Sequence, residues 1–185
     1  MQHLLKTIIP FAAAALLSSC AGNGNAEKNS GMEANHDHAA MEQTTTTANT
    51  KPVLKNDKLN AVYQHYIHLT AALTNGNEAE AKLAANAIEA GAKEVNGATA
   101  IVSSAAKITT ASGIEAQRKW YEVMSNDMIA LVKQEGLSNG ELYIAYCPMA
   151  FNDKGASWIS GSKAIRNPYF GEKMINCGGV KETIN

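Results

Sequence analysis

Apolar residues recur at helical spacing from about residue 57 onward. The first series covers one face of a helix that begins near Asp57 and ends at Asn75-Gly76, where a glycine favours a helix stop. Its members are Leu59, Val62, Tyr63, Tyr66, Leu69 and Leu73. The spacing predicts an amphipathic helix with this face in the core.

An alanine-rich segment predicts a second helix over 79–95, with Asn77 as its N-cap. On this helix we expect Leu83, Ala87, Ile88 and Ala92 to face inward. A shorter helix is expected over about 98–107. A longer one is expected to begin at Ser112 or Gly113 and to end at Gly136. The core stripe predicted for this last helix is Ile114, Trp120, Tyr121, Met124, Met128, Ile129 and Val132.

The pattern changes after residue 141. Residues 142–151 are rich in β-branched and aromatic side chains and predict a strand, and 152–155 predict a turn before a returning strand over 156–160. Asn167-Pro168 indicates a further turn, and several glycines predict an irregular end. The expected fold class over residues 56–185 is therefore mainly α, a small helical bundle with a C-terminal β-hairpin and loop cap.

The N-terminal segment has the features of an export signal. Residues 7–17 form an apolar run that follows Lys6 and is too short for a stable transmembrane helix. Leu17-Ser18-Ser19-Cys20 resembles a bacterial lipobox, in which the cysteine is acylated and becomes the new N-terminus. We therefore expect a signal peptide over 1–19 and a lipid anchor on Cys20. The expected location is the cell envelope, on the periplasmic face of the outer membrane.

Residues 20–55 are polar and contain no aromatic side chain. Such a composition buries too little apolar surface to fold and predicts a disordered tether. The tether contains Met32, His36, His38 and Met41, which form an auxiliary loose site for soft or borderline metals or are incidental residues of a polar linker.

Composition excludes several functional classes. The 16 basic and 17 acidic residues nearly balance, which argues against binding nucleic acid. There is no nucleophile motif, phosphate-binding loop or paired acidic motif, so we expect no enzyme.

Two short segments carry soft metal ligands. Cys147 and Met149 are two residues apart, which places both on one face of an extended chain, and Met174 and Cys177 are three apart, which suits one helical turn. Two thiolates and two thioethers favour Cu(I) or Ag(I). His65 and His68 are possible additional ligands if the cap folds over the first helix. The alternative is a structural disulfide between Cys147 and Cys177, worth about 3 kcal/mol.

The same segments resemble a little-characterised family of periplasmic domains of unknown function. The resemblance runs from about Leu59 to Ile184 and is strongest in the C-terminal cap. The matching tracts are Tyr146-Cys147-Pro148-Met149-Ala150, residues 155–160, residues 165–171, Met174, Cys177-Gly178, Gln117-Arg118 and Ser125. Members of this family stand alone as lipoproteins or are fused to the C-terminus of membrane-fusion subunits of copper and silver efflux pumps. The resemblance therefore implies heavy-metal handling.

Two functions stay open from the sequence. The first is a membrane-tethered Cu(I) or Ag(I) binder that buffers metal or delivers it to an efflux system. The second is a disulfide-stabilised interaction module that docks a pump subunit or another envelope protein through its aromatic cap.

Overall fold

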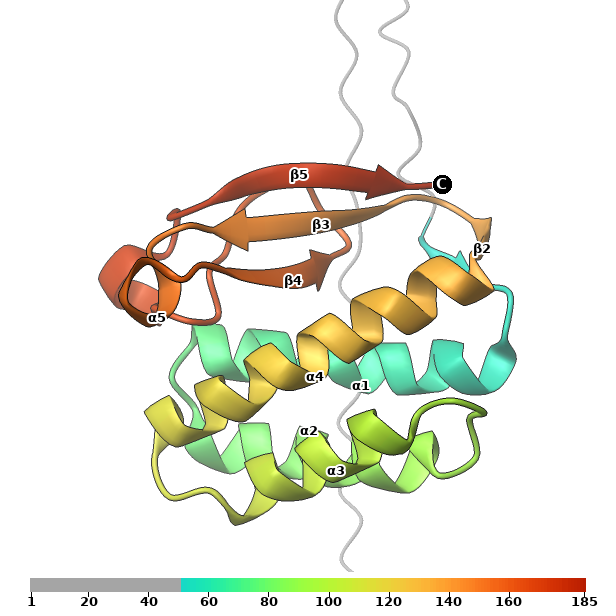
Figure 1. The fold of residues 1–185 in the computed structure, drawn as a ribbon, viewed down its shortest axis with the longest axis horizontal. Coiled ribbons are helices and arrows are strands. Elements are labelled where there is room, and N and C mark those ends of the chain that lie inside the picture. The colour runs from blue at the N-terminus through green and yellow to red at the C-terminus, as the bar shows by residue number, and fades with distance from the viewer. Residues whose placement is uncertain (1–50) are drawn as a thin grey trace, which may run out of the picture. The chain divides into compact units, whose positions relative to one another are not determined.

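A computed structural model describes residues 51–185, and these form a helical bundle with a β-sheet on one side (Figure 1). The four main helices are α1 (Asp57–Thr74), α2 (Glu78–Ala92), α3 (Thr99–Thr110) and α4 (Ile114–Glu135). Each packs against the next along the chain, and α4 also contacts α1. The expected fold class, mainly α with a C-terminal β cap, is confirmed.

The helix ends follow from the sequence signals. Asn56 caps α1 by accepting a hydrogen bond from the Leu59 amide, and Asn77 caps α2 by accepting one from the Glu80 amide. Gly136 follows α4 with a φ of 74°, a left-handed conformation that glycine adopts without a Cβ penalty.

The sheet contains one strand more than the expected hairpin. Strand β3 (Leu142–Cys147) lies between β4 (Ala156–Ser160) and β5 (Gly179–Ile184), and both pairings are antiparallel. Almost all of β5 is exposed. Strand β5 is held chiefly by main-chain pairing with β3. Its sequence therefore lacks the alternation of apolar and polar residues that would predict a strand.

A second, two-stranded ladder joins β1 (Val53–Leu54) to β2 (Leu137–Asn139). Strand β1 lies inside the segment 20–55 that the sequence analysis assigned to a tether. Leu54 is only 1% exposed, so ordered structure extends a few residues before the expected start of the domain.

Two inward-facing assignments are wrong. Leu83 is 62% exposed and Trp120 is 37% exposed. On α2 the buried face is made by small residues together with Ile88, which leaves Leu83 on the solvent side. On α4 the buried face includes Gln117, Arg118 and Tyr121. Trp120 lies outside this face, and the Lys107 ammonium nitrogen lies over its ring, 5.0 Å from the ring centroid.

Polar side chains join the bundle to the sheet inside the core. The Tyr66 hydroxyl lies 2.8 Å from the Ser125 hydroxyl and accepts a hydrogen bond from the Ile159 amide of β4 at 3.1 Å. The Tyr121 hydroxyl donates to Tyr66 at 3.0 Å and lies 2.7 Å from the Thr70 hydroxyl. Burial raises the pKa of Tyr66 and Tyr121, so both remain neutral donors and acceptors.

In the part of the chain that the structure describes, no helix has the length and apolar character needed to cross a membrane.

Candidate functional site

The two cysteines of the cap lie side by side. Cys147 ends the central strand β3 and is fully buried, whereas Cys177 lies in the loop before β5 and is half-buried. Their sulfur atoms are 2.8 Å apart, and both cysteines are free thiols in this structure. The chain therefore brings together two soft donor atoms that are 30 residues apart in sequence.

Gly178 allows this close approach. Its φ is 122°, and a Cβ atom at this position would lie 2.6 Å from the carbonyl oxygen of Tyr146. Any side chain would push the loop away from β3, whose Tyr146 pairs with Gly179 of β5. The glycine after Cys177 is thus a condition for the contact between the two sulfur atoms.

The buried Asn167 side chain holds the loop that carries Cys177. Its Oδ1 accepts hydrogen bonds from the amides of Tyr169 and Phe170, at 2.7 and 3.2 Å. Its Nδ2 donates to the carbonyl oxygen of Cys177 at 2.8 Å. The amide of Asn167 also donates to the Ile175 carbonyl at 2.8 Å. One residue therefore ties both ends of the loop together.

Arg118 fixes the same loop to the bundle. Its Nε donates to the carbonyl oxygen of Pro168 at 2.8 Å, and one terminal nitrogen donates to the Leu73 carbonyl at 2.9 Å. The other terminal nitrogen pairs with the Glu115 carboxylate at 2.8 Å. The guanidinium packs so closely against Gly171 that a Cβ atom there would lie 2.6 Å from it. Arg118 is therefore a positioning residue for the loop.

Polar residues on the buried face of α4 indicate such a structural role in the sequence. Gln117, Arg118 and Ser125 fall on the buried stripe of α4, where apolar residues are expected. Polar side chains on a core stripe indicate buried hydrogen-bond partners. Sequence analysis matched these three residues only through the resemblance and gave them no role, and it interpreted Asn167 only as part of a turn.

The two methionines of the predicted ligand set contact Cys177 through their backbones. The Met149 amide hydrogen-bonds the Cys177 thiol, and the Met174 carbonyl accepts from the Cys177 amide at 3.0 Å. Met149 is 46% exposed, whereas Met174 ends the short 3-10 helix η1 (Gly171–Met174) and is half-buried. All four predicted ligands therefore come from one small region of the cap.

The histidines of α1 do not join this region. His65 and His68 lie on the exposed face of the helix, and the Nε2 atom of His68 is 2.9 Å from a carboxylate oxygen of Glu80 on α2. Within residues 51–185 there is no group of three or more histidine, cysteine, aspartate or glutamate side chains that could hold a metal ion. The leader 1–19, Cys20 and the residues Met32, His36, His38 and Met41 lie outside the described residues.

The neighbouring thiol affects the protonation of Cys177. The hydrogen bond to Cys147, together with burial, raises the pKa of Cys177 above its ordinary value, and the Met149 amide opposes this shift. This shift favours the neutral thiol form of Cys177.

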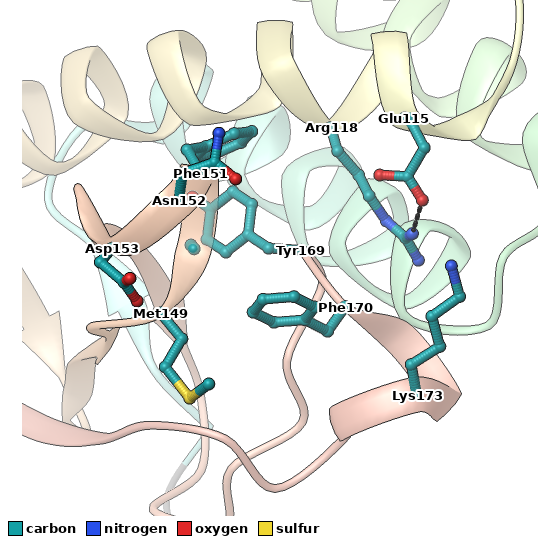
Figure 2. A pocket seen from close by; sticks show the side chains of 10 residues that line it. Glu115, Arg118, Met149, Phe151, Asn152, Asp153, Tyr169, Phe170 and Lys173 are labelled. Carbon is teal, nitrogen blue, oxygen red and sulfur yellow. Dashed lines mark hydrogen bonds and ion pairs between the residues drawn. The ribbon is translucent and has the colours of Figure 1, made fainter.

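A cavity of about 560 Å³ opens beside Met149 (Figure 2). Arg118, Glu115 and Lys173 lie on one side of it, and Met149 and Asp153 lie on the other, with Tyr169 and Phe170 between them. Three consecutive residues at its edge, Phe151, Asn152 and Asp153, have φ values of 54, 57 and 63°. They belong to α5 (Ala150–Asp153), which replaces the expected continuation of the strand after Pro148.

Residues 62–140 match the family model described as "Protein of unknown function (DUF3347)". This segment is therefore similar to a domain of unknown function, and the resemblance agrees with the match to that extent. The match runs from α1 to the turn after β2 and ends before Cys147. No curated protein and no solved structure matches the chain significantly.

Proposed function

We propose that this protein is an envelope lipoprotein that binds one soft monovalent metal ion, Cu(I) or Ag(I), in metal buffering or in delivery to an efflux system. The observation that carries the proposal is the contact between the sulfur atoms of Cys147 and Cys177. Thiolate pairs favour these ions over hard cations. Met149 and Met174, whose backbones contact Cys177, carry thioethers, which are further soft donors.

The donor set argues for a metal with a low coordination number. A structural zinc site takes four ligands from cysteine, histidine or carboxylates. The described residues bring no third ligand of that kind to the cysteines. Two thiolates with a thioether therefore suit Cu(I) or Ag(I) better than Zn(II).

Binding requires a small movement of one cysteine. At the metal–sulfur distance of about 2.3 Å known for zinc thiolates, two sulfurs on one ion stand about 3.8–4.6 Å apart. The two sulfur atoms are 2.8 Å apart in this structure. Cys147 is fixed in the central strand, so the loop carrying Cys177 is the part that moves outward.

The rest of the proposal rests on the sequence. The lipobox-like residues 17–20 support a lipid anchor on the periplasmic face of the outer membrane, and the family resemblance supports an efflux-pump subunit as partner. The proposal includes no catalytic activity.

The test is a Cu(I) titration of the reduced, mature protein under anaerobic conditions, with a chromophoric chelator as competitor. We expect one tightly bound Cu(I) per chain, and loss of that binding in Cys147→Ser and Cys177→Ser. A Met32→Leu/Met41→Leu variant is the control and keeps the tight site. If reduced wild-type protein binds Cu(I) no better than the double cysteine variant, the proposal is wrong.

A disulfide-stabilised interaction module is the second candidate. The observation in its favour is that the sulfur atoms need to approach by less than 1 Å to reach the covalent S–S distance of about 2.05 Å. This candidate predicts no free thiol in protein isolated from the envelope without reductant, and no gain of Cu(I) binding after reduction. A thiol count on such protein, before and after reduction, separates the two functions.

A further inference from the structure

The cavity of about 560 Å³ beside α5 and η1 is lined by a buried cation that has unused hydrogen-bond donors. Arg118 lines this cavity, and its side chain is only 5% exposed. A guanidinium group carries five N–H donors. Within the described residues, Arg118 uses three of them, one each to Pro168, Leu73 and Glu115, so two of the five remain. Free N–H groups on the two terminal nitrogens suit a carboxylate, whose two oxygens accept hydrogen bonds from a guanidinium in parallel.

Opposite charges face each other across the cavity. Lys173 lies on the same side as Arg118, and Asp153 lies on the other side (Figure 2). Neither Lys173 nor Asp153 forms an ion pair within residues 51–185. Glu115 competes for Arg118, because its carboxylate lies 2.8 Å from a terminal nitrogen, but the Glu115 side chain is 67% exposed. An ion pair with one exposed partner contributes little free energy, so a ligand carboxylate can displace Glu115.

The wall between these charges is aromatic. Tyr169 and Phe170 lie between the two sides, and the ring of Phe151 meets that of Tyr169 edge to face, with centroids 5.5 Å apart (Figure 2). The backbone that carries Phe151 is strained, because Phe151, Asn152 and Asp153 all have a positive φ, which is unfavourable for residues with a Cβ atom. Such strain persists only where the surrounding structure enforces it, and it is concentrated at functional sites. Here the strained segment brings an aromatic ring and a carboxylate to the cavity.

We propose that this cavity binds a small aromatic zwitterion, a flat ring with a carboxylate at one end and an ammonium group at the other. The carboxylate accepts hydrogen bonds from Arg118 and pairs with Lys173. The ring packs against Tyr169 and Phe170, and the ammonium group pairs with Asp153. The volume of about 560 Å³ is in the range of small-molecule sites, and a ligand without net charge matches a lining with two basic and two acidic residues. This site is independent of the proposed metal site, because neither cysteine lines the cavity.

The test is a titration of the reduced mature protein with para-(aminomethyl)benzoate, followed in two-dimensional amide NMR spectra. We expect saturable shifts that are largest at the amides of Phe151, Tyr169, Phe170 and Lys173. Two analogues each lack one charged end: para-methylbenzoate has no ammonium group, and benzylamine has no carboxylate. Each analogue should bind about three- to tenfold more weakly, as expected for the loss of one charged contact at a partly exposed site.

Variants at the two ends of the cavity test which side chain holds which group. Lys173→Ala should weaken binding about threefold. Lys163→Ala removes an equal charge from a cap residue that does not line the cavity, and should leave the affinity unchanged. Asp153→Asn keeps a side chain that tolerates the left-handed backbone conformation of this residue. It should weaken binding of the zwitterion about threefold and should not weaken binding of para-methylbenzoate.

Glu115→Ala tests the role of Arg118 without replacing a residue that positions the loop. The variant frees a donor of Arg118 and should strengthen binding about threefold. The matched control is Glu94→Ala, because Glu94 pairs with Lys58 and does not line the cavity. Glu94→Ala should leave the affinity unchanged.

Three outcomes would overturn the proposal. The first is the absence of saturable shifts at the cavity amides at millimolar ligand. The second is equal affinity for para-(aminomethyl)benzoate and para-methylbenzoate, which would show that no group in the cavity binds the ammonium end. The third is equal weakening by Lys173→Ala and Lys163→Ala, which would show general charge attraction in place of a site. The Cu(I) titration is a separate measurement, so failure of either proposal leaves the other standing.

Discussion

The helical bundle and the loop of the cap that carries Cys177 are held in place by different kinds of interaction. In the bundle, Leu59, Leu69, Ile88 and other apolar residues are fully buried between neighbouring helices. In the cap, the loop before β5 depends on a few polar contacts from Asn167 and Arg118 and on glycines at backbone positions that exclude a side chain. Apolar packing is spread over many residues, whereas the loop is sensitive to the loss of single groups.

This difference bears on the chemistry of the cysteines. Cys147 belongs to a sheet that rests on α4, while Cys177 belongs to the loop that the polar contacts hold. Cys147 is therefore held by strand pairing and core packing, and Cys177 by a few directional hydrogen bonds.

The largest expected effect is in the bundle. Leu69 on α1 is 0% exposed, and Leu69→Ala should lower the free energy of unfolding by about 3–4 kcal/mol, because the substitution leaves a cavity between packed helices. Urea denaturation followed by circular dichroism measures the change. The matched control is Leu83→Ala, which removes a 62% exposed leucine and should change stability by about 0.5 kcal/mol or less. Equal losses in both variants would contradict the packing described for α2.

A smaller and more local effect is expected in the cap. Asn167→Ala removes the amide that binds the Cys177 carbonyl and the Tyr169 and Phe170 amides, and should destabilise the loop by about 2–3 kcal/mol. The helical circular dichroism should remain, while Cys177 reacts faster with a thiol reagent. Asn176→Ala, at an exposed position of the same loop, is the control. Cooperative loss of the helices in Asn167→Ala would show that cap and bundle unfold as one unit.

The smallest expected effect concerns the protonation of the thiols. Because the Cys147 thiol raises the pKa of Cys177, the folded state favours the protonated form. The stabilisation from this thiol contact is present below the ordinary cysteine pKa of about 8.5, and is lost as pH rises through the raised value. At pH 8, iodoacetamide should therefore alkylate Cys177 more slowly in the folded, reduced protein than it alkylates the same cysteine in the urea-unfolded chain. A faster reaction in the folded protein would contradict the direction of the shift.

Much of the fold could be predicted from local sequence. The spacing of apolar residues located α1 and α4, and Asn77 and Gly136 marked helix ends because capping depends on a few neighbouring residues. The returning strand at Ala156–Ser160 was predicted because a clear turn signal precedes it. Strand β5 was missed, since its pairing with β3 depends on a segment more than 30 residues away and on main-chain groups that every residue has.

The candidate site also has features that could be predicted from local sequence and features that could not. The residues that carry soft donor atoms could be identified from the sequence, because sulfur chemistry belongs to the residue type: Cys147, Met149, Met174 and Cys177. The folded structure was needed to show that the two cysteine sulfurs meet and that His68 pairs with Glu80 instead of joining them. It also showed that Arg118 and Asn167 hold the loop. Those outcomes depend on contacts between segments distant in the chain, and a local pattern of residues carries no information about which distant carbonyl or sulfur will lie within bonding distance.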